Sequence, residues 1–162
     1  MTGCIVGWAH SKFGKLEGQD VEALIVEAAT NAMADAGVGP DDIDAIYLGY
    51  FNNGFADQDF PSSLVLQADD RFRFKPATRV ENACATGSAA IHQGLNFLEA
   101  KQGKVVLVVG VEKMTDTPGA DIGGILMKAS YLKEDSEIEG GFAGVFGQIA
   151  QQYYQKYGDH QD

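Results

Sequence analysis

The order of apolar segments along the chain is the feature that most constrains its fold. Between Asp20 and Gly37, apolar residues recur at helical spacing, and these two residues suit a helix N-cap and a C-terminal stop. Shorter apolar runs at residues 4–8 and 45–50 flank this helix and are typical of buried strands. A strand, a helix and a strand in succession predict a right-handed crossover between parallel strands. The sequence therefore predicts an α/β fold with a mostly parallel sheet flanked by helices.

The rest of the chain continues this alternation. The run VVLVVG is the most β-branched in the chain and predicts the central strand. The segment after Met114 is rich in Gly, Asp and Thr and predicts a long excursion over the surface. We therefore expect a core over residues 1–114 and the start of a loop subdomain, itself truncated, over residues 115–162. The other predicted elements are a short helix at 61–68, a strand at 78–81, a helix from 84 to a stop at Gly103, and a final helix at 142–157. The helix that begins at 84 is expected to be buried at its start. The aromatic stripe of the final helix is expected to pack in the core or in an interface.

The charge of the chain narrows the classes of partner. Its 162 residues carry 23 acidic and 12 basic side chains, a formal net charge of −11. Nucleic-acid binding needs a clustered basic face, so nucleic acid is not an expected partner. The local cluster of Arg71, Arg73 and Lys75 could still bind a polyphosphate such as that of coenzyme A. The first residues lack a basic leader and a long apolar core, and no apolar run approaches a membrane span, so we expect a soluble cytoplasmic protein without an export signal or a membrane contact.

The two cysteines, Cys4 and Cys84, are too few for a disulfide framework and lack the spacing of metal ligands. We expect no metal site. Cys4 lies in a predicted strand and is expected to pack as a small hydrophobic residue. Cys84 lies where a predicted strand turns into a helix.

The segment from Glu81 to Ser88 could carry chemistry. A helix N-terminus leaves backbone N–H groups unpaired and stabilises a thiolate, which is the nucleophilic form of cysteine. The same N–H groups could donate to a thioester oxygen as its carbonyl carbon becomes tetrahedral. Small neighbours such as Gly87 leave room for a substrate. A cysteine among small apolar residues is also often a buried and inert one, so the residues alone leave both interpretations open.

Several segments resemble a known family. VENACATGSAAIHQGL resembles the nucleophile motif of the thiolase superfamily, especially its acetyl-CoA acetyltransferase and sterol-carrier-protein-type branches. VVLVVGVEKMTDTP resembles the Gly-x-Glu-x-Met segment of that family. The opening IVGWAHSKFGK, the turn AGVGPDDIDAIYLG and the late FAGVFGQIAQQYYQKYG occur in the order that thiolases show. The resemblance spans essentially the whole chain and concerns the N-terminal portion of a thiolase only.

The resemblance implies a fold, a reaction and a partner. The fold would be an incomplete N-terminal half of the five-layer αβαβα arrangement of thiolases. Cys84 would accept the acyl group of an acyl-CoA, with coenzyme A as a substrate rather than a permanently bound cofactor. The residues that bind it remain unknown, although Lys128 and Lys133 of the excursion could contribute. A homodimer would form through the strand at residues 77–82.

The resemblance also implies parts that this sequence lacks. In thiolases the activating histidine, a second catalytic cysteine and the oxyanion contacts come from the C-terminal half, whose motifs do not occur here. His92 lies eight residues beyond Cys84, roughly 12 Å along a helix, and nothing brings His10 or His160 to Cys84. We therefore expect this chain alone to be inactive or only partly active. It could be a fragment, a subunit of a split enzyme or a degenerate paralogue, and the acyl-chain length and reaction direction stay open.

Two other functions fit the sequence. A thiolase-like half could serve as a non-catalytic interaction or scaffold module, in which Cys84 is unreactive. A thiol redox protein would need a resolving cysteine, and Cys4 is the only candidate.

Overall fold

The computed structural model describes residues 3–158, so that His160 lies outside the described residues. The chain divides into two compact units. The first comprises the chain up to residue 52 and residues 56–116, and the second comprises residues 53–55 and the chain from residue 117 onward. Each unit is described by itself.

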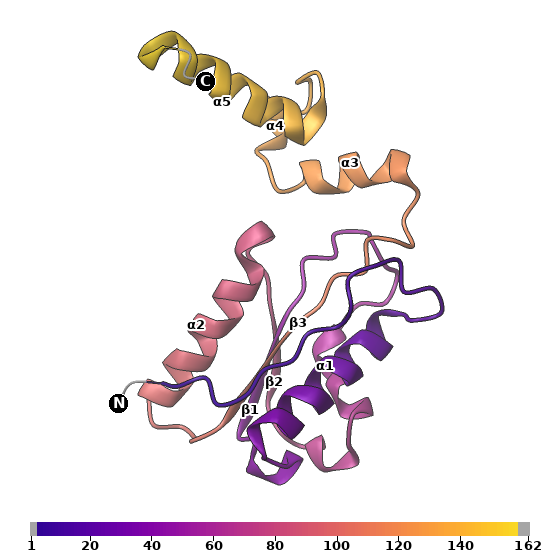
Figure 1. Cartoon of the computed structure of the whole chain (residues 1–162), viewed down its shortest axis with the longest axis vertical. Helices are drawn as coiled ribbons and strands as arrows, with labels where there is room; N and C mark the ends of the chain where they lie inside the picture. Colours follow the sequence, from indigo (N-terminus) through magenta and orange to yellow (C-terminus); the bar gives the residue numbers. More distant parts are fainter. Residues whose placement is uncertain (1–2, 159–162) are drawn as a thin grey trace. The chain divides into compact units, whose positions relative to one another are not determined.

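The first unit is built on a parallel sheet of three strands in the order β2-β1-β3. Ile46 of β1 aligns with Ala77 of β2 and with Leu107 of β3. Helices α1 and α2 lie on opposite sides of these strands (Figure 1). The structure thus confirms the predicted α/β class. Its elements are α1 (Val21–Ala36), β1 (Ala45–Gly49), β2 (Ala77–Val80), α2 (Thr86–Glu99) and β3 (Val106–Gly110), with 3-10 turns η1 (Pro40–Asp42), η2 (Pro61–Gln67), η3 (Asp70–Phe72) and η4 (Ala83–Ala85).

Helix α1 forms as predicted because both of its ends are capped. Asp20 Oδ1 accepts a hydrogen bond from the N–H of Ala23 at 2.8 Å. Gly37 adopts the left-handed conformation at φ 66° and its N–H bonds back to Ala34 O. Both caps satisfy backbone groups that a helix end would otherwise leave unpaired.

The two faces of β1 meet different helices, because side chains alternate along a strand. Ile46, Leu48 and Tyr50 belong to the buried cluster that includes Val21 and Ile25 of α1. On the opposite face, the ring of Tyr47 contacts the edge of Phe97 from α2, with ring centroids 6.4 Å apart. The central strand β1 is therefore covered by a helix on each face.

Two predictions about the sheet are wrong. The central strand is β1, and β3 has a single strand partner among the described residues. The predicted strand at residues 4–8 is an irregular segment, in which Cys4, Ile5 and Trp8 are exposed. An apolar cavity of about 540 Å³ lies between this segment and β3, with both helices contributing to its lining. A strand requires a neighbour for its backbone groups, and residues 4–8 are separated from β3 by this cavity.

The start and the end of α2 also differ from expectation. Thr86 and Ala90 are buried, but Cys84, Ala85, Gly87 and Ser88 are exposed, so the predicted burial of the helix start is wrong for most of its residues. The helix ends at Glu99 rather than continuing to Gly103. Lys101 adopts a left-handed conformation at φ 58°, which is incompatible with a continuing helix.

The second unit contains helices within the predicted excursion. These are α3 (Gly119–Met127), α4 (Leu132–Asp135) and α5 (Gly141–Tyr157). The predicted final helix is confirmed as α5, but none of its residues is buried in the described chain, so its aromatic stripe is not part of a core. Packing of this stripe in an interface stays a prediction. Within residues 3–158, the helices are all too short or too polar to cross a bilayer.

Asp44 holds the loop that leads into β3. Its Oδ2 accepts hydrogen bonds from the N–H groups of Lys104 at 2.6 Å and Val105 at 3.0 Å. These bonds, chiefly the one from Lys104, lower the pKa of Asp44 below its usual value. A carboxyl with a lowered folded pKa stabilises the fold above its unfolded pKa of about 3.9, and this contribution is lost as the pH falls through the folded pKa.

We predict that Asp44→Ala lowers the free energy of unfolding at neutral pH by about 1 kcal/mol, because two backbone donors lose their acceptor. Asp44→Asn keeps an acceptor oxygen and should retain more stability, while its stability should depend less on pH in the acid range. Urea unfolding at neutral and acid pH measures both effects. Asp57→Ala, in an exposed loop, is the control. Equal stability of Asp44→Ala and Asp57→Ala would contradict the prediction.

Candidate functional site

The carboxyl ends of the three parallel strands bring the candidate chemical groups to one edge of the sheet. β1 leads into Tyr50, β2 into the turn that carries Cys84, and β3 into Glu112. The ends are joined by backbone hydrogen bonds, from Tyr50 N to Val80 O at 3.1 Å and from Val111 N to Gly49 O at 3.0 Å. Ligands of parallel sheets commonly bind at this edge, so it is the candidate site.

Cys84 lies in a tight turn between β2 and α2, which we call the cysteine turn (residues 81–86). The preceding Ala83 has φ 47°, a left-handed conformation that is unfavourable for a residue with a Cβ. Thr86 Oγ1 accepts a hydrogen bond from Asn82 N at 2.8 Å and donates one to Ala83 O at 2.6 Å. Cys84 itself is exposed. The turn thus presents the thiol of Cys84 to solvent.

The backbone amides of the cysteine turn are largely used within it. Ala83 N–H donates to Glu81 Oε1, Ala85 N–H to Asn82 O at 2.9 Å, and Thr86 N–H to Ala83 O. We had expected N–H groups at this helix start to donate to a thioester oxygen. For these three amides the expectation is wrong, because a paired N–H cannot stabilise an oxyanion without losing its partner.

The end of β1 approaches the start of α2 closely because residue 49 is a glycine. A Cβ at Gly49 would lie 3.1 Å from Thr86 Cγ2 and 3.5 Å from Ala90 Cβ. The first distance is tighter than most carbon contacts and the second is an ordinary van der Waals contact, so the absence of a side chain at this position allows the helix to sit against the strand.

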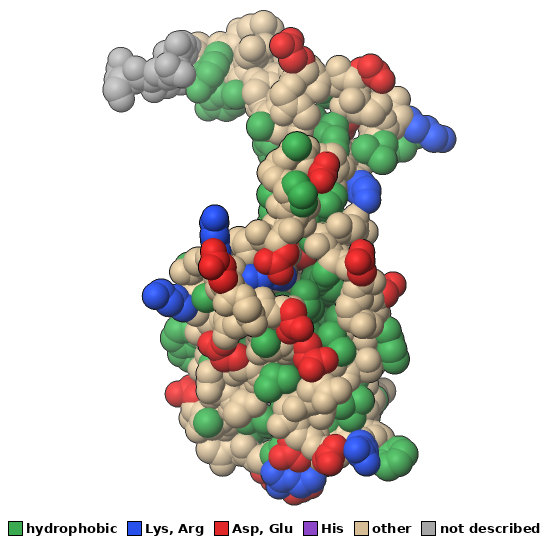
Figure 2. Space-filling view, turned by 90° about the vertical axis from the view of Figure 1, so that its right-hand side faces the viewer, with side chains coloured by type: hydrophobic (Ala, Val, Ile, Leu, Met, Phe, Trp, Pro, Cys, Tyr) green, Lys and Arg blue, Asp and Glu red, His purple; other side chains and the backbone are tan. Residues whose placement is uncertain are grey.

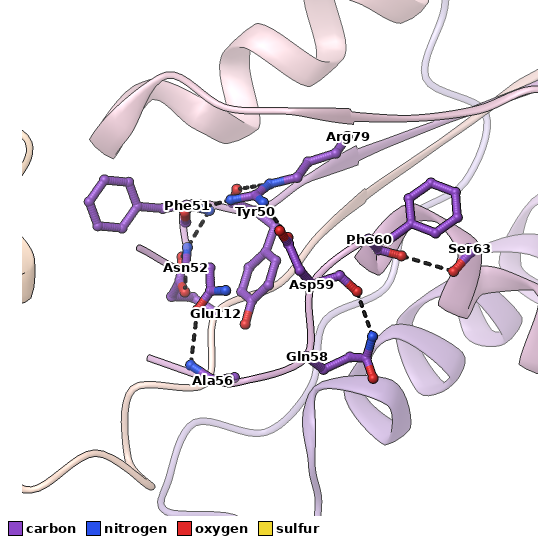
Figure 3. A network of polar contacts seen from close by, with 10 residues as sticks. All are labelled: Tyr50, Phe51, Asn52, Ala56, Gln58, Asp59, Phe60, Ser63, Arg79 and Glu112. Atoms are coloured by element: carbon purple, nitrogen blue, oxygen red, sulfur yellow. Dashed lines mark hydrogen bonds and ion pairs between the residues drawn. The ribbon is translucent and has the colours of Figure 1, made fainter. Parts of the chain in front are cut away.

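Arg79 and Glu112 hold the chain that leaves β1 from two sides (Figure 3). Arg79 donates from Nε to Tyr50 O at 3.0 Å and from a terminal nitrogen to Phe51 O at 2.8 Å, and it pairs with Asp59 at 2.8 Å. Glu112 accepts from the N–H groups of Phe51 and Asn52, each at 3.2 Å. One side chain thus bonds the carbonyls of this segment and the other bonds its amides.

The same network contains two groups with perturbed acidity. Burial raises the pKa of Glu112, and this effect exceeds the opposing hydrogen bonds from Asn52 and Phe51 and the charge of Arg79. Burial, with the nearby charge of Glu112, raises the pKa of Tyr50 to about 12. The Tyr50 hydroxyl is fully buried and has no hydrogen-bond partner among the described residues. Tyr50 therefore stays neutral at physiological pH and belongs to the core cluster.

Sequence reasoning gave Arg79 and Thr86 no role. Arg79 could have been noticed as a charged residue within the short strand ATRV, because a charge there needs partners. Glu112 lies in the quoted Gly110–Met114 segment, but its hydrogen bonds to residues about 60 positions earlier are not visible in the sequence.

The basic side chains of the cluster at Arg71, Arg73 and Lys75 are bonded within the chain. Arg71 pairs with Asp41 at 3.0 Å and with Asp69 at 2.8 Å, and Arg73 pairs with Asp70 at 2.9 Å. The Lys75 ammonium donates to Ile43 O at 2.6 Å. These residues also precede β2, whereas Cys84 follows it, so the strand separates them.

The other residues that the sequence suggested for the site have partners of their own or are exposed to solvent. The His10 ring contacts Ser11 O at 2.5 Å and stacks on Phe13 at 4.6 Å, and His92 is exposed on α2. Lys128 donates to Asn53 O within the second unit. No disulfide joins Cys4 and Cys84, and no metal-binding group of His, Cys, Asp or Glu occurs within residues 3–158. Figure 2 shows acidic side chains spread over the face in view, with several Lys and Arg side chains beside them.

Comparisons with known proteins agree with the fold and the motif. The family described as "Thiolase, N-terminal domain" matches residues 4–158. The chain is 36% identical to an acetyl-CoA acetyltransferase of Methanocaldococcus jannaschii and 32% identical to one of Methanothermobacter thermautotrophicus, each over 95% of this chain. These matches cover 39% and 40% of the relatives, so the chain spans about two fifths of their length. The chain belongs to the thiolase family and corresponds to its N-terminal domain.

Solved structures support the fold alone. An acetyl-CoA acetyltransferase from Syntrophomonas wolfei superimposes with a TM-score of 0.66 at 22% identity, over 95% of this chain and 41% of that one. A solved aldolase superimposes with a TM-score of 0.70 at 21% identity, over 96% of this chain and 38% of that one. The same α/β arrangement thus occurs in an acetyltransferase and in an aldolase.

The raised pKa of Glu112 gives a testable pH dependence. A carboxyl with a raised folded pKa favours folding while it is protonated, so its contribution is complete below the unfolded pKa of about 4.3 and is lost as the pH rises through the folded pKa. We predict that Glu112→Gln removes this component, so that the stability of the variant improves relative to wild type as the pH rises through this window. Urea unfolding midpoints across the window measure it.

Glu99→Gln, at the exposed end of α2, is the matched control and should follow the wild-type profile. Parallel pH profiles for wild type and Glu112→Gln would show that the buried carboxyl does not titrate as inferred.

Proposed function

We propose that Cys84 is the acyl-accepting nucleophile of a thiolase-type acyl transfer between CoA thioesters. The observation that carries this proposal is the exposed thiol of Cys84 on a tight strand-to-helix turn, in a chain that belongs to the thiolase family. Two relatives of this chain bear the name acetyl-CoA acetyltransferase, which makes acetyl-CoA the first donor to test.

The proposed first step is a transfer of one acyl group. The Cys84 thiol loses its proton to solvent or to a base, and the thiolate attacks the thioester carbonyl carbon. A new carbon–sulfur bond forms at Cys84, the bond to the coenzyme A sulfur breaks, and the leaving thiolate takes up a proton. The products are an acyl-cysteine and free coenzyme A. The direction of any second step, towards a longer or a shorter acyl chain, is left to experiment.

The proposal assigns the remaining catalytic groups to chain beyond the described residues or to a partner. The amides of Ala83, Ala85 and Thr86 are paired within the cysteine turn. His10 contacts Ser11 and Phe13, and His92 is exposed on α2. We propose that a base and further oxyanion donors come from elsewhere. A thiolase C-terminal half is the partner we propose, since the relatives extend well beyond the matched length.

Two further features belong to the proposal. β2 is an edge strand of the sheet with one side unpaired in the described chain, and residues 77–82 are the proposed contact of a homodimer. A reducing compartment such as the cytoplasm suits a reaction that depends on a thiol. Coenzyme A acts as a substrate in this scheme, and its contacts are left unassigned.

The alternative function is a non-catalytic interaction module built on the same fold. Its support is the exposed aromatic stripe of α5, where Phe146, Ile149 and Tyr153 lie open to solvent and suit contact with another protein. The reactivity of Cys84 separates the two functions.

We predict that incubation of the chain and a thiolase C-terminal half with acetyl-CoA adds one acetyl group to Cys84 and releases an equal amount of coenzyme A, whereas the chain alone gives little or only partial acylation. Intact mass, peptide mapping and thiol release measure the adduct. Cys84→Ser should abolish it, whereas Cys4→Ser, which removes the other exposed thiol, should leave it unchanged. A folded wild-type chain that forms no adduct, alone and with a thiolase C-terminal half, would overturn the enzymatic proposal in favour of the module.

A further inference from the structure

We propose that Thr86 is a positioning residue for the reaction at Cys84: its hydroxyl fixes the cysteine turn, and its methyl group fixes that turn against β1. This inference rests on the proposed function of Cys84. It concerns the orientation of the Cys84 thiol rather than the identity of the reacting group.

The Thr86 hydroxyl forms two hydrogen bonds with the backbone of the cysteine turn. It accepts from Asn82 N at 2.8 Å and donates to Ala83 O at 2.6 Å. These atoms precede Cys84, whereas Thr86 follows it, so the cysteine lies inside a loop closed by this one oxygen. Thr86 is only 8% exposed, which shields both hydrogen bonds from water.

The direction of these bonds distinguishes them from ordinary helix capping. A capping hydroxyl accepts from an amide two or three residues further into its helix. Thr86 is the first residue of α2, and its oxygen bonds backwards to residues 82 and 83. The N-cap position of α2 is Ala85, which has no side-chain cap. The hydroxyl therefore stabilises the turn rather than the helix.

The turn needs such support because its backbone is strained. Ala83 has φ 47°, and a residue with a Cβ keeps this conformation only where its surroundings hold it. Ala83 is joined directly to Cys84. If residue 83 relaxed to a negative φ, the peptide before Cys84 would rotate and the sulfur would point elsewhere.

The methyl group of Thr86 sets the position of the turn on the sheet. A Cβ built on Gly49 would lie 3.1 Å from Thr86 Cγ2 and 3.3 Å from Thr86 O. The first turn of α2 therefore rests directly on the last residue of β1. The hydroxyl of Thr86 thus bonds within the cysteine turn, and its methyl group packs the turn against the central strand.

The test compares three variants. Thr86→Val replaces the hydroxyl with a methyl group of similar size, and Thr86→Ser keeps the hydroxyl. Thr30→Val makes the same change at an exposed position of α1 and is the matched control. Each variant is measured, alone and with a thiolase C-terminal half, for the acylation rate of Cys84 at saturating acetyl-CoA, the rate of alkylation by iodoacetamide, and the free energy of unfolding.

For Thr86→Val we expect the acylation rate at saturation to fall by at least about tenfold, because misplacement of a reacting atom is costly. Alkylation should change much less, since a small reagent reaches an exposed thiol from many directions. Thr86→Ser should retain most of the acylation rate, and Thr30→Val all of it. Gly49→Ala, which keeps the hydroxyl but displaces Thr86, should resemble Thr86→Val.

Two results would overturn the inference. One is a Thr86→Val protein that is less stable but acylates at the wild-type rate, which would make the hydroxyl purely structural. The other is an equal fall in acylation and alkylation, which would indicate a general loss of thiol reactivity rather than misplacement.

Amide hydrogen exchange separates this inference from the proposed function. Faster exchange at residues 82–86 in Thr86→Val, but not in Thr86→Ser, is expected if the hydroxyl holds the turn. If wild type is not acylated, the proposed function fails and the positioning role fails with it, even where exchange shows that Thr86 holds the turn. If wild type is acylated and Thr86→Val exchanges like wild type, only the positioning inference fails.

Discussion

Parallel pairing of β1 with both β2 and β3 decides where the chemical groups of the first unit lie. The paired strands end at the same level, with Gly49 aligned to Val80 on one side and to Gly110 on the other. The residues that follow each strand are therefore neighbours, although they are far apart in the sequence. Glu112 reaches the amides of Phe51 and Asn52 for this reason, and Arg79 reaches the carbonyl of Tyr50. The cysteine turn begins at the same edge.

Local patterns predicted the elements better than their arrangement. The helix over Val21–Ala36 could be predicted because its caps and its apolar spacing are properties of contiguous residues. The place of VVLVVG in the sheet could not, since composition indicates burial and not which strand lies beside which. Residues 4–8 have the composition of a strand and exposed apolar side chains, but in the described chain a cavity separates them from β3. Strand formation depends on a neighbour that no local pattern reports.

The candidate site divides in the same way. Cys84 could be predicted because a contiguous motif carries the resemblance, and the family match supports the assignment of the chain though not the role of the residue. The functions of Arg79, Glu112 and Thr86 depend on backbone partners that only the fold brings together. The basic cluster depends on distant partners as well. Three cations close in sequence suggested an anion site, but Arg71 is bonded to Asp41, which lies 30 residues earlier.

The cysteine turn uses its own polar groups to maintain an unfavourable backbone, and this limits what it can do for a substrate. The amides of Ala83 and Ala85 and the hydroxyl of Thr86 all have partners within the turn. They can hold the thiol in place, but they cannot also stabilise a developing oxyanion without breaking the bonds that hold it. Under the proposed function, these three groups therefore orient the thiol of Cys84 and leave oxyanion stabilisation to other donors. The two acetyl-CoA acetyltransferases that match this chain are more than twice its length, and the proposed function places those other donors in the part of a thiolase that this chain does not cover.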